Sequence, residues 1–168
     1  EKNLLQERSI DKAVVLGWSP RATNLNDRME TIKDMIDDAK KLGITKMLID
    51  PATMPVGAGY GLDYRTILTI KSELGLPTCL GPHNAPSAWK FLRRPDFNTK
   101  RTHLAAIVAS TAVAQILATD SVMYGSMKRT KEVFAATSLI ANAIATAAAE
   151  ANRSLGRDEE LFNPPTFE

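Results

Sequence analysis

The feature of this sequence that most restricts its fold is a repeated alternation of a short apolar run with a longer stretch of helical periodicity. The apolar runs are 13–18, 46–49, 77–80 and 121–125. Runs of this length and composition, bounded by Gly, Pro or polar residues, predict buried strands. Strands that alternate with helices predict a parallel sheet with right-handed crossovers, covered by helices on both faces.

The stretches that follow these runs place apolar residues three and four positions apart, which predicts amphipathic helices. The best defined of them begins near Met29, where Asn26 or Asp27 can supply the N-terminal cap, and ends before Gly43. We expect helices at 29–42, 63–74, 86–92, 101–118 and 130–152, with Gly75 ending the second of them.

Two architectures accommodate this alternation: an open doubly wound sheet and part of a (β/α)8 barrel. Four βα units are half of the eight that a closed barrel requires. We therefore expect an α/β chain in which residues 1–155 form the second half of a TIM barrel, with a tail at 156–168 that lacks regular structure. A helix-like stretch at 4–6 comes just before the first strand. Half a barrel leaves its first and last strands as unpaired edges, which proteins normally cover. We therefore expect the first half of the barrel to be a separate chain or a missing segment.

Composition removes several classes of function. The 21 basic and 19 acidic residues leave a net charge of +2, which gives no electrostatic basis for binding nucleic acid. No uninterrupted run of about 18 apolar residues predicts a membrane span, and no signal peptide stands at the N-terminus. The single cysteine, Cys79, cannot form an internal disulfide, which fits a cytoplasmic setting. With only two histidines besides, we expect no metal site.

Ligands of parallel α/β folds bind at the carboxyl ends of the strands, so the residues that follow each run are the candidates for a site. Asp50 directly follows the second run. A partly desolvated carboxylate there needs hydrogen-bond donors, and the adjacent N–H groups of an aminopyrimidine ring would satisfy both of its oxygens. The alternative is that Asp50 caps local backbone N–H groups before Pro51.

The segment after the third run ends in His83 and Asn84. The amide of Asn84 offers both a donor and an acceptor, so it can follow a ring nitrogen through a change of protonation. Alternatively, Asn84 caps a short helix that begins at Pro86. His83 is a candidate proton donor, although the sequence offers it no obvious orienting partner. His103 lies inside an apolar helix, where we expect it to pack.

Other motifs are less specific. The glycines at 57, 59 and 61 do not have the spacing of the dinucleotide fingerprint, and no P-loop is present, so we interpret 56–61 as a closely packed or flexible loop. Three basic pairs, at 93–94, 100–101 and 128–129, follow the third and fourth runs. They are either a solvated surface or a contact for an anionic ligand tail. Trp89 and Tyr124 either stack on a planar ligand or pack in the core.

The segments after the strands resemble one known family. The sequences DPATMPVG (50–57), IKS (70–72) and GPHNAPSAW (81–89), together with AVVLGWSP (13–20) and VMYG (122–125), are similar to the H-subunit family of tetrahydromethanopterin S-methyltransferase. The resemblance covers essentially the whole chain but only the later half of that family's barrel. More distantly, the chain is similar to methyltetrahydrofolate–corrinoid methyltransferases and dihydropteroate synthase, which share a pterin-binding barrel.

The resemblance implies specific roles. Asp50 corresponds to the aspartate that holds the pyrimidine edge of the pterin, and Asn84 to the asparagine near N5, the methyl-bearing nitrogen. Gly81 corresponds to the glycine that lets the backbone approach the ring, and Ser87 belongs to the same substrate-binding segment. His83 departs from the wider family, in which serine is usual, so the role of that serine does not carry over.

The expected function is therefore that of a methyltransferase. A methyl group would move between N5 of a tetrahydropterin, either tetrahydrofolate or tetrahydromethanopterin, and the cobalt of a corrinoid carried by a partner protein, with Asn84 as the catalytic residue. We also expect a homodimer that is cytoplasmic or peripheral to a membrane methyltransferase complex. Two alternatives remain: another pterin enzyme of the dihydropteroate-synthase type, and a non-catalytic half-barrel subunit that needs a partner chain.

Overall fold

The computed structural model describes residues 10–150 of the 168-residue chain. The stretch at 4–6 and the tail at 156–168 lie outside the described residues. The strands are β1 (Lys12–Leu16), β2 (Lys46–Asp50), β3 (Cys79–Leu80) and β4 (Ser121–Val122). The α-helices are α2 (Leu25–Lys41), α3 (Tyr60–Thr69), α4 (Asn84–Ala88), α5 (Lys100–Ile116) and α6 (Thr130–Glu150). A π-helical turn, η1 (Ile70–Leu74), and two 3-10 turns, η2 (Lys90–Arg93) and η3 (Met127–Arg129), complete the described elements.

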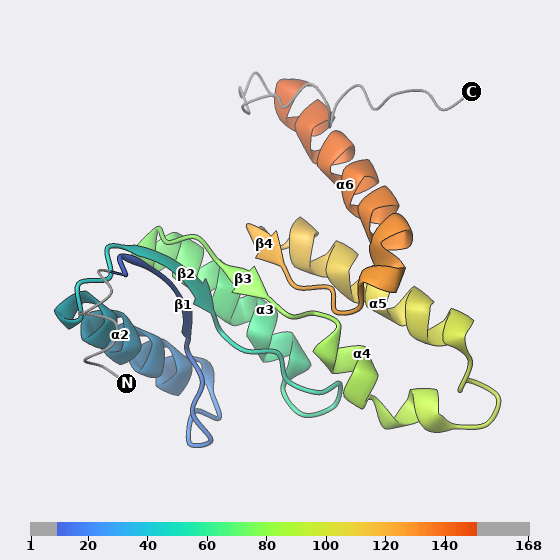
Figure 1. The fold of residues 1–168 in the computed structure, drawn as a ribbon, viewed down its shortest axis with the longest axis horizontal. Helices are drawn as coiled ribbons and strands as arrows, with labels where there is room; N and C mark the ends of the chain where they lie inside the picture. Colours follow the sequence, from blue (N-terminus) through green and yellow to red (C-terminus); the bar gives the residue numbers. More distant parts are fainter. Residues whose placement is uncertain (1–9, 151–168) are drawn as a thin grey trace.

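The four strands are neighbours in chain order and run parallel (Figure 1). β1 pairs with β2 from Lys12 opposite Lys46 to Leu16 opposite Asp50, and β3 pairs with β4. A parallel bridge between Ile49 and Thr78 joins the two pairs. The α/β class with parallel strands is thus confirmed. The fourth strand is shorter than its apolar run, since pairing ends at Val122.

Helix α2 buries one face against the β1–β2 pair. Met29, Ile32 and Ile36 form a core cluster with Val15 and Ile49, which is the packing that the apolar spacing predicts. The N-terminal cap is Asn24, whose side chain accepts a hydrogen bond from the backbone N–H of Asp27. The predicted caps, Asn26 and Asp27, are therefore wrong, because the helix begins at Leu25, one turn before Met29.

Helix α3 packs on the other pair of strands. Tyr64 and Ile67 form a second core cluster with Leu80 of β3 and Ala114 of α5. The helix begins at Tyr60, three residues before the predicted start, because Gly59 at its N-terminus adopts a φ of +112°. It continues into the π-helical turn η1, which ends at Gly75 as predicted, with a φ of +63°.

The region between β3 and β4 departs from the predicted short helix. Instead of one helix at 86–92, the chain forms α4 and then η2, separated by Trp89 in an extended conformation (φ −72°, ψ 112°). Helix α5 follows, and Thr99 caps it through a reciprocal hydrogen-bond pair with Thr102.

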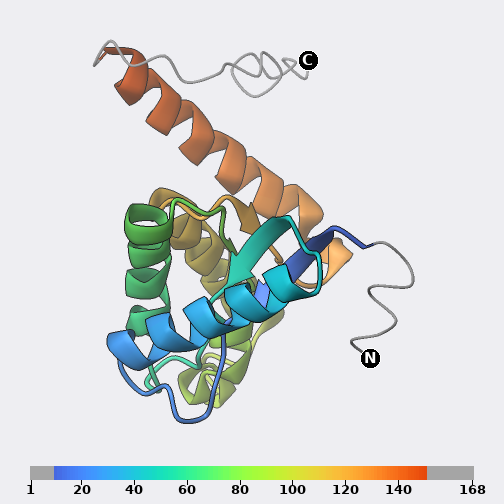
Figure 2. The ribbon, with the colours of Figure 1, turned by 90° about the vertical axis from the view of Figure 1, so that its left-hand side faces the viewer.

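Two apolar surfaces lack cover within the described residues. Val14 and Leu16 of β1 are 57% and 55% exposed on the sheet face opposite α2. Helix α6 packs on α5 near its N-terminus and then extends away from the body of the molecule (Figures 1 and 2), so that Phe134, Leu139 and Ile144 are exposed. The sheet and the last helix therefore both present apolar side chains to solvent.

The segment Met127–Glu150 is long and apolar enough to cross a membrane, by length and composition alone. This modifies the expectation that no segment would qualify. A single helix of this kind is weak evidence for a membrane span, because the core helix of a soluble protein meets the same criterion.

Candidate functional site

Hydrogen bonds join the carboxyl ends of the strands in two pairs, β1 with β2 and β3 with β4. The backbone N–H of Gly17, after β1, donates to the carbonyl of Asp50, at the end of β2, over 2.8 Å. His83, after β3, contacts the carbonyl of Met123, after β4, through Nδ1 at 2.6 Å. A single parallel bridge, between Ile49 and Thr78, joins the two pairs, so the candidate residues follow neighbouring strands.

Asp50 is the last residue of β2 and is only 8% exposed. Its Oδ1 accepts a hydrogen bond from the backbone N–H of Ala52 over 2.8 Å, and this contact accompanies a φ of +66° at Ala52. Burial raises the pKa of Asp50, and the Ala52 hydrogen bond only partly offsets it. Local capping thus occupies one oxygen, while Oδ2 makes no hydrogen bond with the described residues and is available to a ligand.

Asn84 is the first residue of α4, and its exposed side chain makes no hydrogen bond with the described residues. The interpretation of Asn84 as a helix cap is therefore wrong, because the capping position belongs to His83. Gly81 is buried beside it, and a Cβ at this glycine would lie 3.0 Å from Nδ2 of Asn84. The absence of a side chain at Gly81 therefore leaves room for the Asn84 amide.

His83 has an orienting partner that the sequence did not reveal. Because the Met123 carbonyl can only accept, Nδ1 of His83 must carry the proton in their 2.6 Å contact. In the neutral ring, Nε2 is then an acceptor. Gly125 lies beside the His83 ring and has a φ of +87°. A Cβ at this position would lie 2.8 Å from Cδ2 of His83, so the ring occupies space that only glycine leaves open.

Ser87 lies one turn after His83 on the exposed side of α4. Its Oγ donates to the carbonyl of His83 over 2.7 Å. This contact stabilises the first turn of the short helix, and the substrate contact expected of Ser87 stays a prediction.

Sequence reasoning missed a buried ion pair behind the site. Nη1 of Arg28, on α2, lies 2.5 Å from Oδ1 of Asp63, on α3, and both side chains are almost fully buried. Oδ2 of Asp63 accepts the backbone N–H of Met54 over 2.7 Å. Asp63 therefore connects two helices to the loop that follows Asp50. In the sequence, Arg28 looks like an ordinary polar residue of a helix, and partners that are 35 positions apart give no local signal.

The same loop contains a polar atom without a partner. Oγ1 of Thr53 is shielded from solvent and makes no hydrogen bond with the described residues. Buried hydroxyl groups are normally satisfied, so this atom is a second candidate ligand contact beside Asp50. Thr53 lay within the motif at 50–57, but nothing in the sequence distinguished it from its neighbours.

The two aromatic candidates, Trp89 and Tyr124, pack against neighbouring aromatic side chains. Trp89 stacks on Phe91, with ring centroids 5.0 Å apart. Tyr124 bonds Thr130 through its hydroxyl and meets Phe134 edge-on. For both side chains, the packing interpretation describes the structure.

Comparison with known proteins identifies the family. A model of the tetrahydromethanopterin S-methyltransferase MtrH subunit matches residues 1–156. The chain belongs to the MtrH family. This confirms the resemblance that the strand-end motifs indicated.

Individual relatives of this MtrH-family chain give the same result. It is 34% identical over 153 residues to the H-subunit of tetrahydromethanopterin S-methyltransferase from Methanosarcina acetivorans, covering 83% of this chain and 48% of the relative. It is 29% identical over 170 residues to the H-subunit of the same enzyme from Methanothermobacter thermautotrophicus, covering 96% of this chain and 55% of the relative. The MtrH-family chain thus spans about half the length of the curated relatives it matches.

Proposed function

We propose that this chain contributes the pterin-binding strand ends of a methyltransferase that moves a methyl group between N5 of a tetrahydropterin and the cobalt of a corrinoid. The observation that carries the proposal is the pair of polar groups after neighbouring strands: a buried Asp50 carboxylate with one unused oxygen, and an exposed Asn84 amide without a partner among the described residues. Membership of the MtrH family supports the same activity.

The fold proposed for the complete site is a pterin-binding (β/α)8 barrel, with residues 1–155 as its second half and 156–168 as a tail. Two observations support it. The strands follow one another in chain order without the reversal that marks an open doubly wound sheet. The face of β1 that would line the barrel interior is apolar and uncovered, as it would be if the other half were absent.

In this proposal the pterin lies across the ends of β2 and β3. Oδ2 of Asp50 accepts from the aminopyrimidine edge, and burial of the carboxylate strengthens that contact because little water competes for it. Gly81 lets the ring approach the backbone, while His83 and Ser87 border the ring on the side of α4. The names of the relatives favour tetrahydromethanopterin over tetrahydrofolate as the substrate.

Asn84 is the proposed catalytic residue. N5 is a tertiary amine and a poor leaving group, so its departure must be assisted as its charge changes. The Asn84 amide can donate to N5 or accept from it, and a contact that strengthens in the transition state lowers the barrier. The partner's corrinoid supplies the cobalt that receives or gives up the methyl group.

The proton for N5 cannot come from Asn84, which is not an acid. With Nδ1–H held by the Met123 carbonyl, neutral His83 presents only an acceptor at Nε2. His83 can therefore donate from Nε2 only in its doubly protonated form. The other source is solvent that enters at the exposed side of α4.

The proposed partners are a corrinoid protein, the first half of the barrel and a second copy of this chain. The uncovered face of β1 supports the first half of the barrel as a partner. The exposed apolar residues of α6 support a homodimer contact. We place the protein in the cytoplasm or peripheral to a membrane methyltransferase complex. A non-catalytic role as a half-barrel subunit is the alternative.

Replacement of Asn84 tests the proposal. Asn84→Ala, assayed together with the first half of the barrel, should lower kcat for methyl transfer between methylcobalamin and tetrahydropterin by about 10²-fold. The thermal unfolding midpoint should not change, because the side chain makes no hydrogen bond with the described residues. Asn142→Ala, an exposed asparagine of α6, is the matched control. A full methyl-transfer rate in Asn84→Ala would overturn the assignment.

A further inference from the structure

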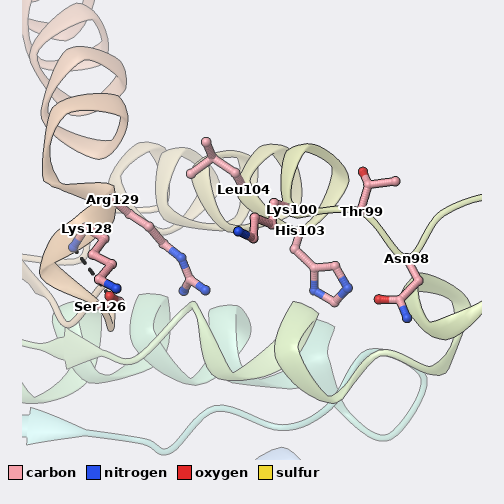
Figure 3. A pocket seen from close by; sticks show the side chains of 8 residues that line it. All are labelled: Asn98, Thr99, Lys100, His103, Leu104, Ser126, Lys128 and Arg129. Carbon is pink, nitrogen blue, oxygen red and sulfur yellow. Dashed lines mark hydrogen bonds between the residues drawn. The ribbon is translucent and has the colours of Figure 1, made fainter.

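A cavity of about 510 Å³ lies between the first turn of α5 and the 3-10 turn η3 (Figure 3). Lys100 and His103 line it from α5, and Lys128 and Arg129 line it from η3. Figure 3 shows Arg129 and His103 reaching toward the hollow from opposite sides, with Lys100 between them. The volume lies in the range of small-molecule sites.

The charged side chains that line this cavity are all basic. Three of the residues that line it are basic, namely Lys100, Lys128 and Arg129, and none is Asp or Glu. Within residues 10–150, no acidic side chain forms an ion pair with these three. Other lysines of the same chain do find such partners, and these are Lys33, Lys40, Lys41 and Lys71. The cavity therefore concentrates positive charge that the described part of the protein does not neutralise.

Helix α5 adds to this field. It is 17 residues long and starts at the cavity wall, so its N-terminal end presents a partial positive charge there. Thr99 satisfies the N–H of Thr102 through its side chain. The N–H groups of Lys100 and Arg101, in the first turn, donate to no such partner among the described residues, and they remain free to bind an anion.

His103 lines the cavity rather than serving only as the packing residue expected from its apolar surroundings. Its Nε2 lies 3.2 Å from the carbonyl of Leu92, so this nitrogen donates and the ring is held in one orientation. Nδ1 then remains available to the cavity, which makes the ring a reporter of anything bound there.

The cavity adjoins the strand-end site. Ser126, in its wall, directly follows Gly125, which is in contact with the ring of His83. A ligand whose ring lies beside Asn84 can thus extend past His83 and place its far end among Lys100, Lys128 and Arg129.

We propose that this cavity binds the anionic tail, carrying carboxylate or phosphate groups, of the substrate whose ring lies at Asp50 and Asn84. The assignment of the tail rests on the proposed pterin function, whereas the capacity of the cavity to bind an anion does not. Of the three basic pairs in the sequence, only residues at 100 and 128–129 reach this cavity. Arg94 instead lies over the rings of Phe91 and Phe97.

The test compares two double variants that remove the same charge from the same two regions. The double variant Lys100→Ala with Arg129→Ala removes two of the basic side chains that line the cavity. Arg101→Ala with Lys131→Ala removes their exposed sequence neighbours, which do not line it. The protein, assembled with its barrel partner, is titrated with 5-methyltetrahydrofolate carrying one or three glutamates. Inorganic phosphate is titrated separately while the ring resonances of His103 are followed by NMR.

We expect the triglutamate to bind the unaltered protein about ten-fold more tightly than the monoglutamate, and the cavity variant to lose this gain while the control keeps it. We also expect phosphate to shift the His103 resonances in the unaltered protein and to compete with the triglutamate only. A gain that survives in the cavity variant, or an equal loss in both variants, overturns the proposal.

Failure of the proposed function has a different signature. In that case neither the folates nor 5-methyltetrahydromethanopterin bind, yet phosphate still shifts His103 in the unaltered protein and not in the cavity variant. This result would leave an anion site but refute its assignment to a pterin tail. Methyl transfer from the monoglutamate without any gain from a longer tail would instead refute the tail proposal alone.

Discussion

Asp50 combines burial with incomplete hydrogen bonding, and this has a consequence for stability. Burial raises its pKa above the ordinary value of 3.8, so the folded protein holds the proton more tightly than the unfolded chain does. The stabilising contribution of Asp50 is therefore fully present below the unfolded pKa and is lost as the pH rises through the folded pKa. Ionisation of the buried Asp50 carboxyl therefore costs the folded protein stability.

Asp50→Asn should remove that dependence. In urea unfolding from about pH 4 to pH 7, the free energy of unfolding of the variant should fall less with rising pH than that of the unaltered protein, while pterin binding is lost. Asn can keep the contact with the N–H of Ala52 through its carbonyl oxygen. Asp34→Asn, at an exposed position of α2, is the control. A variant whose pH profile parallels that of the unaltered protein would contradict this account of Asp50.

Gly125 is constrained by both its backbone and its neighbour. Gly125→Ala should destabilise the protein by about 1–3 kcal/mol in chemical denaturation, because it adds strain at a φ of +87° and a contact of 2.8 Å with His83. Gly57→Ala has the same backbone cost, with a φ of +89°, but meets nothing within 4 Å. Only the first substitution should disturb the His83 resonances. Equal effects of the two variants would show that the contact with His83 does not matter.

At the level of residues, sequence position alone located Asp50 and Asn84, because strand ends are recognisable from apolar runs. It did not locate Arg28 or Asp63. Their pairing depends on how α2 and α3 pack, and no local pattern encodes the distance between two helix faces. The partner of His83 was missed for the same reason, since a backbone carbonyl 40 residues away carries no sequence signature.

At the level of elements, the Arg28–Asp63 pair attaches α2, α3 and the loop after β2 to one another. Arg28→Met should lower the free energy of unfolding by about 3–5 kcal/mol, because it leaves the carboxylate of Asp63 buried without its cation. Urea denaturation measures the change. The loop carrying Met54 should also lose protection from hydrogen exchange.

A second ion pair, between α2 and the π-helical turn η1 that continues α3, provides the control. Lys33 of α2 lies 3.4 Å from Glu73 of η1, and both side chains are about half exposed. Lys33→Met should therefore change the free energy of unfolding by less than about 1 kcal/mol. If the two substitutions had similar effects, burial would not be the source of the strength of the Arg28–Asp63 pair.

The order and type of the elements were predictable because alternating apolar runs and helical periodicity are strong signals. Their boundaries were less so. Asn24 was not recognised as a cap because Leu25 was not counted in the apolar periodicity, and Asn26 and Asp27 stand closer to Met29. The π-helical turn at Ile70–Leu74 has no sequence signature that separates it from an α-helix. These details follow from packing rather than from local preference.

At the level of the whole molecule, the exposed face of β1 is the surface at which we propose that the first half of a barrel joins the described strands. Leu16→Asp should weaken binding to a chain carrying that half by about 10²-fold in isothermal titration calorimetry, since the contact would bury an unpaired charge. Ile116→Asp, at a position of α5 that is 61% exposed against 55% for Leu16, should have little effect. If Leu16→Asp left the affinity unchanged, β1 would not be the joining surface.

The unpaired edge of β1 also affects the tendency of the protein to aggregate. Among the described residues, β1 has a neighbouring strand only on the side of β2. A free edge of parallel strand beside an apolar face is a template for pairing with other chains, including further copies of itself. An edge of β1 that nothing covers would therefore favour self-association and aggregation of the protein.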